Sequence, residues 1–152
     1  MDELEQFKRA NFFPGLQVGP EYWNKIEDYH FGKEKLYNSL FHGYGVVPKF
    51  LDSLHVQAGK TKGGLVTFIV GRGLCFDGLG NPLFLYEPQV IVFDSKKYSY
   101  PCTIHIVIKY NEVLQEFFQN TENIDLQGYK YKLESAKVEL VQEITEPDIT
   151  VE

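Results

Sequence analysis

The sequence predicts a mainly β protein of the α+β type, in which one long N-terminal helix precedes an antiparallel β-sandwich. Between about residues 20 and 42, apolar residues recur at three- to four-residue spacing, which is typical of an amphipathic helix. After residue 46 they alternate at two-residue spacing, and clusters of Gly, Asn and Pro separate the alternating segments, as expected for strands joined by turns. A length of 152 residues favours one domain.

Within this single domain, 1–152, we expect four consecutive parts. They are an N-terminal arm at 1–19, a helix at 20–42, a β body at 46–144 and a polar tail at 145–152. The tail has no capping pattern, as in a fragment of a longer chain.

The helix begins with favourable residues and has an unusually wide apolar face. Pro20 suits the first helical position, and Glu21 is favourable near the positive end of the helix dipole. The apolar arc is wider than the ~100° that packing on one sheet requires, so the helix is predicted to form a protein interface as well. The alternative is that Phe7, Phe12 and Phe13 of the N-terminal arm cover the surplus face. The interface candidates are Tyr22, Trp23, Tyr29, His30, Phe31 and Phe41.

Two glycines mark the exit from the helix. Gly43 suits the left-handed conformation that ends a helix, where a Cβ would be strained. Gly45 permits a second tight backbone change before the β body, and Tyr44 is expected to pack on the core or to face a partner. His42, near the helix C-terminus, is favourable there when protonated, and we prefer this role to catalysis.

The β body is predicted from alternating segments in chain order. Strands are expected at 52–58 and 65–70, paired as a hairpin through a turn at 59–64. Further strands are expected at 74–76, 83–86, 89–93 and 102–110, with Asp77 and Gly78 in a tight turn. Residues 111–128 are ambiguous, and we expect a short helix at 113–118 followed by a loop. One or two final strands are expected at 129–144.

Composition excludes several classes of protein. The formal charge of -6 and the lack of a basic stripe argue against nucleic-acid binding. The longest apolar run falls short of the ~18 residues that span a bilayer, and the acidic residues 1–5 do not resemble a signal peptide. We therefore expect a cytoplasmic protein, in which Cys75 and Cys102 are free thiols rather than a disulfide.

Motifs of known enzyme sites are incomplete. AGKT at 58–61 resembles the end of a phosphate-binding loop, but Leu54 stands where that loop requires glycine. Gly71, Gly73 and Gly78 lack the spacing of a dinucleotide-binding fingerprint. The histidines lack the spacing of a metal-binding pair; they are His30, His42, His55 and His105.

Acid–base and nucleophilic sites are also poorly supported. Asp77 and Glu87 could be imagined as a carboxylate pair, but an Asp-Gly dipeptide usually serves a turn. The serines have no nucleophile-elbow motif around them. We therefore predict that the protein is not an enzyme and binds no cofactor and no metal.

Five motifs follow one another along the chain: FFPGLQVGPEYW, YHFGKEKLYNSLFHGYGVVPKF, LHVQ, GRGLCFDGLGNPLFL and TIHIVIKYNE. This series, spanning about 11–142, resembles the N-terminal domain of the TssK family, the baseplate adaptors of type VI secretion. It also resembles related domains of contractile injection systems and phage tails. Glu21 and Tyr22 stand where the family usually has Gln-His. The matching positions are Phe13, Gly15, Leu16, Val18, Pro20, Trp23, Tyr29, His30, Gly43, Tyr44, Gly45, Val46, Phe76, Asp77 and Gly78.

The resemblance implies a shoulder-domain-like β-sandwich and a structural function. Its expected role is that of an adaptor in a bacterial, cytoplasmic baseplate, anchored to wedge proteins and assembled as a homo-oligomer, by resemblance a trimer. Two alternatives remain. One is a receptor- or carbohydrate-binding tail module on the same scaffold, and the other is an enzyme with an unrecognised site.

Overall fold

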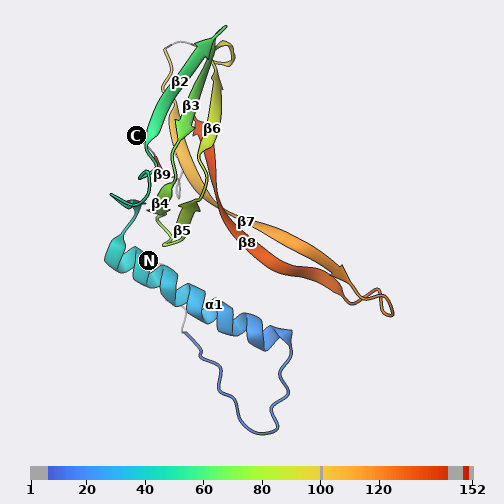
Figure 1. Ribbon diagram of the computed structural model, residues 1–152. Coiled ribbons are helices and arrows are strands. Elements are labelled where there is room, and N and C mark those ends of the chain that lie inside the picture. Colours follow the sequence, from blue (N-terminus) through green and yellow to red (C-terminus); the bar gives the residue numbers. More distant parts are fainter. Residues whose placement is uncertain (1–6, 100, 144–148, 151–152) are drawn as a thin grey trace.

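The computed structural model describes residues 7–99, 101–143 and 149–150, and it shows a mainly β protein with one α-helix (Figure 1). The predicted class is confirmed at this level, because the strands of the described residues form three antiparallel sheets. The elements in chain order are α1 (Pro20–Tyr37), the π-helical turn η1 (Asn38–His42), β1 (Gly45–Val46), β2 (Val56–Lys62), β3 (Leu65–Val70), β4 (Gly73–Phe76), β5 (Pro82–Leu85), β6 (Gln89–Asp94), the 3₁₀ turn η2 (Ser95–Lys97), β7 (His105–Gln119), β8 (Gln127–Val141) and β9 (Ile149–Thr150).

The predicted helix at 20–42 is present, but its last five residues form the π-helical turn η1. Gly43 ends it by donating its backbone N–H to the carbonyl oxygen of Asn38, at 3.0 Å. Its φ of 70° and ψ of -157° lie in a region that is essentially restricted to glycine. Gly45 follows with a φ of 137°. Gly43 thus has the positive φ expected of a glycine that ends a helix, but its ψ lies outside the left-handed helical conformation that was predicted. Gly45 has a backbone conformation that residues with a Cβ rarely adopt.

The sheets have the orders β1-β4-β5, β2-β3-β6 and β8-β7-β9. The predicted antiparallel hairpin of β2 and β3 is confirmed, although its turn is shorter than expected. Gly63 and Gly64 alone separate the two strands, with φ values of 62° and 90°. The expected strand start at 52 is wrong, because the Asp52 carboxylate accepts hydrogen bonds from the backbone N–H and the Nε–H of Arg72. These bonds hold the segment before β2 in turns.

One hydrophobic core joins the three sheets. Val70 of β3 and Ile91 of β6 contribute from one sheet, and Ile108 of β7 contributes from another. Burial, followed by the nearby charge of Asp77, raises the pKa of Cys75 to about 12. Cys75 and Cys102 are free thiols, as predicted. The buried residues of this cluster are Leu54, Val70, Cys75, Leu83, Leu85, Ile108 and Ala136. Val107 is fully buried as well.

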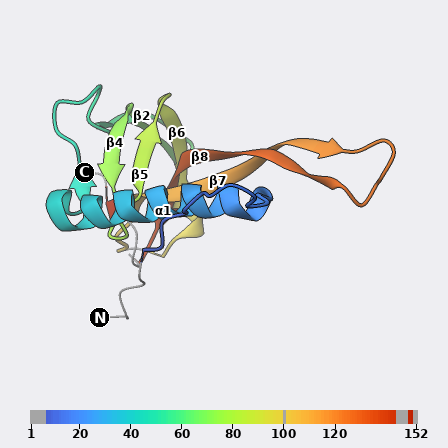
Figure 2. The same ribbon diagram turned by 90° about the horizontal axis from the view of Figure 1, so that it is seen from below.

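The expected helix at 113–118 is wrong, because this segment is part of β7. β7 and β8 pair over their whole length, from His105 opposite Val141 to Gln119 opposite Gln127. Two of the cross-strand pairs, Val113 with Leu133 and Phe117 with Tyr129, join β-branched, aliphatic or aromatic side chains, which favour strands over helix. We call residues 111–135 the hairpin arm; it projects away from the β body (Figures 1 and 2).

The tail predicted at 145–152 lies outside the described residues, except for β9. The backbone of β9 pairs with β7 at Val107 and Ile108. None of the described helices combines the length and the apolar composition needed to cross a bilayer.

Candidate protein–protein interface

The helix α1 lies along the lower side of the β body, beside the base of the hairpin arm (Figure 2). All residues of α1 are described, and none of them is buried. Trp23 is 60% exposed, and Phe41 in η1 is 77% exposed. His30 is also exposed, whereas the remaining interface candidates, Tyr22, Tyr29 and Phe31, are half-buried.

The N-terminal arm covers only part of this surface. The ring of Phe7 packs edge-on against Tyr29, with centroids 6.1 Å apart, and Gly32 leaves room for this ring. Phe12 lies 6.2 Å from Trp23, also between ring centroids. Trp23 nevertheless remains largely exposed, so the described part of the arm leaves an aromatic surface on α1.

A groove runs between the N-terminal arm and α1, with a volume of about 430 Å³. Lys33 lies in it with its Nζ 5.4 Å from the ring centroid of Tyr29 and 5.6 Å from that of Tyr37. Interaction with Tyr37, and secondarily with Tyr29, raises the pKa of Lys33 above its ordinary value. The groove thus combines a stable positive charge with aromatic rings.

The C-terminal end of the helix anchors it to the β body. The side-chain amide of Asn38 donates a buried hydrogen bond of 3.0 Å to the carbonyl oxygen of Gly80. The ammonium group of Lys35 lies 5.8 Å from the ring centroid of Tyr110, on β7. His42 stacks on Phe76 of β4, with ring centroids 5.7 Å apart and an interplanar angle of 14°. His42 therefore has a packing contact with the β body.

The Asp77 turn receives this helix end. The buried Asp77 carboxylate accepts hydrogen bonds from the backbone N–H groups of Leu79 and Asn81 and from the Asn81 amide, the last at 2.6 Å. Its oxygens are therefore occupied in shaping the turn. The glycine of this turn that has a left-handed backbone is Gly80, with a φ of 81°.

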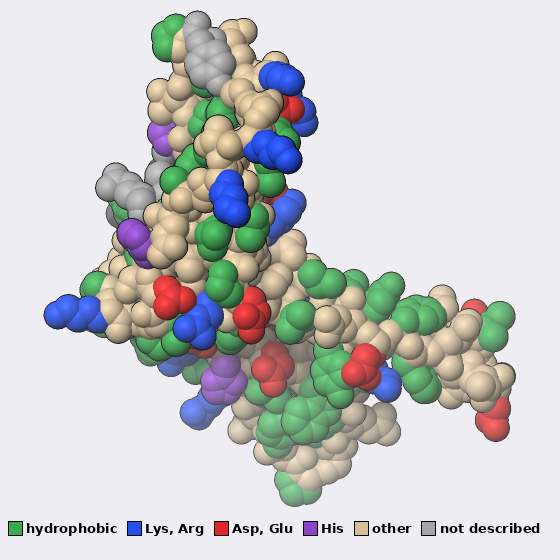
Figure 3. Space-filling model, turned by 45° about the horizontal axis from the view of Figure 1, so that its top comes forward, with side chains coloured by type: hydrophobic (Ala, Val, Ile, Leu, Met, Phe, Trp, Pro, Cys, Tyr) green, Lys and Arg blue, Asp and Glu red, His purple; other side chains and the backbone are tan. Residues whose placement is uncertain are grey.

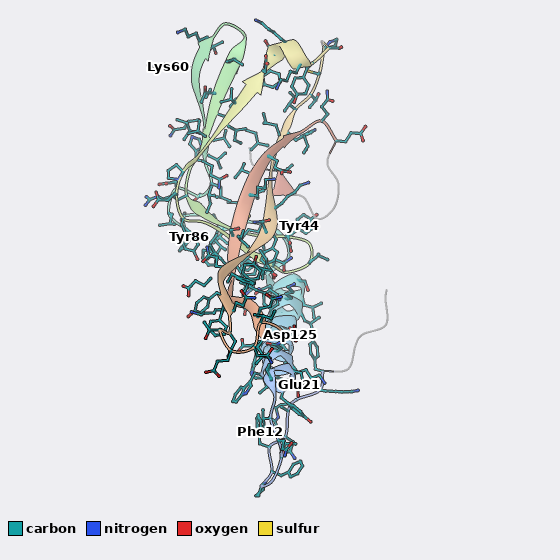
Figure 4. All side chains as sticks on the ribbon, turned by 90° about the vertical axis from the view of Figure 1, so that its right-hand side faces the viewer. Phe12, Glu21, Tyr44, Lys60, Tyr86 and Asp125 are labelled. Carbon is teal, nitrogen blue, oxygen red and sulfur yellow. The ribbon has the colours of Figure 1, made fainter. Side chains whose placement is uncertain are left out.

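Tyr44, between the exit glycines, is 78% exposed, so it faces outward rather than packing on the core. Figure 4 shows it on the β body, well away from Phe12 at the far end of the helix. The predicted candidates thus fall into two places: the surface of α1 and the junction between α1 and the β body.

The hairpin arm as a unit was not predicted, although a final strand was expected at 129–144, where β8 lies. Its aromatic and aliphatic side chains alternate along two strands, and this spacing at 113–117 and 129–133 was the signal that could have revealed it. Its large exposed apolar side chains are Val113, Leu114, Phe117, Phe118, Ile124, Leu126, Tyr129, Tyr131 and Leu133.

Comparison of the chain with protein-family models, with curated proteins and with solved structures finds no significant match.

Proposed function

We propose that this protein is a structural subunit of a larger protein assembly. The observation that supports this is the amount of surface it exposes. The accessible surface of the chain is 11870 Å², whereas a compact monomer of 17.6 kDa exposes about 7,900 Å². The excess is about 4,000 Å² for one chain, and one permanent interface buries about 2,000–5,000 Å² counted over both partners, so the excess is enough for more than one such contact.

The excess surface has the chemistry of an interface. α1 and η1 expose Trp23 and Phe41, and the hairpin arm exposes aromatic and aliphatic side chains on both strands. Large apolar patches on a soluble domain usually mark association surfaces, and aromatic residues are enriched at the energetic centres of interfaces. A subunit that presents a helix and a hairpin in this way is suited to contact several neighbours.

The particular assembly that we propose is the baseplate of a contractile injection system or phage-like tail, in which this domain would be an adaptor to wedge proteins. The TssK-like motifs coincide with the features that join α1 to the β body. Gly43 and Gly45 form the helix exit, and Asp77 forms the turn that receives the helix end. A shoulder-like β-sandwich and a homo-oligomer are part of the same proposal.

The experiment is affinity purification of the tagged chain from its native host, followed by mass spectrometry. Enrichment of baseplate wedge proteins would support the proposal, and their absence from the wild-type purification would refute it. Trp23→Asp and Phe41→Asp are expected to reduce their recovery at least tenfold, because both place a charge on the exposed aromatic surface of α1. Tyr86→Asp is the control, since Tyr86 is 69% exposed and lies on the β body away from the helix (Figure 4).

One observation favours the alternative of a carbohydrate-binding module. Phe84 and Tyr86 stack with centroids 5.6 Å apart, and Phe50 packs edge-on against Phe84 at 6.5 Å. Sugar rings stack on exposed aromatic faces of this kind. Glycan-array binding that is lost in Tyr86→Ala and retained in Trp23→Asp would favour this function over the assembly role.

A further inference from the structure

The hairpin arm has one continuous apolar face. Its strands pair without a register shift from residue 111 opposite 135 to residue 119 opposite 127, so directly opposed residues share a face. The rings of one such pair, Phe117 and Tyr129, lie 5.3 Å apart between centroids. At about 3.3 Å per residue, the segment 111–119 spans about 30 Å. This face, the apolar arm face, consists of Val113, Phe117, Tyr129, Tyr131 and Leu133, which are 44–58% exposed.

The apolar arm face is not a continuation of the face that packs on the core. In the base of the hairpin, the residues of β7 that belong to or pack on the core cluster, Ile106, Ile108 and Tyr110, occupy even positions. Val107, at an odd position, is also fully buried. In the hairpin arm, Val113 and Phe117 occupy odd positions, on the opposite face of the ribbon. The apolar arm face therefore lies on the side of the ribbon opposite to Ile106, Ile108 and Tyr110, and its own side chains remain about half exposed.

A second exposed apolar face lies on the sheet β2-β3-β6. Ile69 is paired with Val90, and Thr67 is paired with Val92, so these side chains share the outer face of the sheet. Their neighbours along the strands, such as Val70, pack into the core instead. The outer sheet face comprises Leu65, Ile69, Val90 and Val92, which are 37–63% exposed.

The segments that bear the two faces carry opposite net charge. The hairpin arm contains five acidic and two basic residues, a net charge of -3. The segments 56–70 and 89–97, which form the sheet and η2, contain four lysines and one aspartate, a net charge of +3. In Figure 3, blue side chains gather over the upper part of the body, whereas red ones predominate on the arm. The four lysines are Lys60, Lys62, Lys96 and Lys97.

We propose that the hairpin arm of one copy docks on the outer sheet face of a second copy of this chain. Apolar surface would cover apolar surface, and the acidic arm would meet the basic sheet, which favours this register over others. Arm-to-arm pairing is disfavoured, because it would bring two charges of -3 together. The contact is heterologous: each copy contributes its arm to one neighbour and its sheet to another, as in a closed ring or a helical array. This inference rests on the proposed function and names one partner of the subunit.

Size-exclusion chromatography with light scattering, together with sedimentation, tests the contact on the full chain. The wild-type protein is expected to self-associate, and more weakly at high salt because the charges are screened. Phe117→Ser on the apolar arm face should weaken self-association at least tenfold. Phe118→Ser is the matched control: Phe118 is adjacent and similarly exposed, but it lies on the opposite face, so the expected change is below about threefold.

Charge reversal identifies the surfaces that meet. Glu122→Lys with Asp125→Lys makes the arm basic, and Lys60→Glu with Lys62→Glu makes the sheet acidic. Each double variant alone should be monomeric, because both of its docking surfaces then have the same sign. An equimolar mixture of the two should associate again, since the basic arm meets the acidic sheet and the unaltered arm meets the unaltered sheet.

The inference would be overturned by a wild-type chain that remains monomeric at about 100 µM. This concentration is tenfold above a dissociation constant of about 10 µM, which is typical of a weak contact. Self-association that persists in Phe117→Ser, or that the mixture fails to restore, would also overturn it. None of these outcomes changes the recovery of wedge proteins in the purification described above, so the contact and the proposed function fail separately.

Discussion

Gly80 offers the sharpest test of how α1 is held against the β body. It has a φ of 81°, which side chains with a Cβ rarely adopt. A Cβ at Gly80 would overlap the carbonyl oxygen of Lys35 and lie 2.8 Å from its carbonyl carbon. Because the obstacle is the helix backbone, it cannot be removed by rotating a side chain. Gly80→Ala must therefore strain the turn, displace the helix end, or both.

The expected cost follows from these two terms. The left-handed conformation costs an alanine about 1–2 kcal/mol relative to glycine, and overpacking a close contact costs about 1–3 kcal/mol. The sum of about 2–5 kcal/mol is a large share of a typical stability of 5–15 kcal/mol. For a chain of this size it corresponds to a fall in melting temperature of roughly 5–15 °C.

Thermal unfolding by circular dichroism measures this fall, and Gly78→Ala is the matched control. Gly78 lies two residues away in the same turn, but it lacks a left-handed φ and has no atom within 4 Å of the Cβ position. Its substitution should be neutral or slightly stabilising, by up to ~1 kcal/mol. Hydrogen exchange should also quicken at residues 34–43 in Gly80→Ala and stay unchanged in β3. Equal melting temperatures of the two variants would refute the assigned contact.

The remaining predictions concern the helix exit, the buried thiol and ligand binding. Gly43→Val should destabilise the protein by at least about 1 kcal/mol, because valine is strained in the backbone conformation of Gly43. His42→Gln removes only an exposed stacking contact and should cost less. Equal shifts in the melting temperatures of the two variants would contradict this. Cys75 should resist iodoacetamide at pH 8 in the folded protein, unlike the partly exposed Cys102, as peptide mass spectrometry can show. Burial raises the pKa of Cys75 from its ordinary 9.0 to about 12. The stability contributed by burying the neutral thiol is therefore complete below pH 9, and it declines as the pH rises from 9 towards 12 because the unfolded chain loses this proton first. Cys75→Ala should therefore flatten the alkaline decline of the melting temperature; an unchanged decline would argue against burial of the thiol. Neither zinc nor ATP should raise the melting temperature, and a shift of several degrees that Lys60→Ala or His30→Ala abolishes would disprove this.

Local sequence signals determined those parts of the fold that depend on neighbouring residues. Pro20 determines where α1 begins, and Gly43 determines where the following turn η1 ends, because each residue has a backbone preference of its own. The alternation at 65–70 identified β3 for a similar reason, since one face of a strand must be apolar. These features needed no knowledge of distant contacts.

Other features depended on residues far apart in the chain. Residues 113–118 have no decisive local preference, and they form a strand because residues 128–133 pair with them across the hairpin. Gly78 and Gly80 look alike in the sequence, yet only Gly80 meets the backbone of Lys35, some 45 positions earlier. The burial of Asp77 likewise arises from this packed turn.

The exposure of the apolar side chains was also decided by the tertiary structure. The periodicity of α1 predicted an apolar stripe, but only the fold shows that the helix is anchored at its C-terminal end and leaves Trp23 exposed. In the hairpin arm, β7 and β8 pair with each other and extend beyond the core, so their apolar side chains remain exposed. A sequence specifies which side chains are apolar; which of them remain uncovered depends on where the body ends, and this is a property of the packed chain alone.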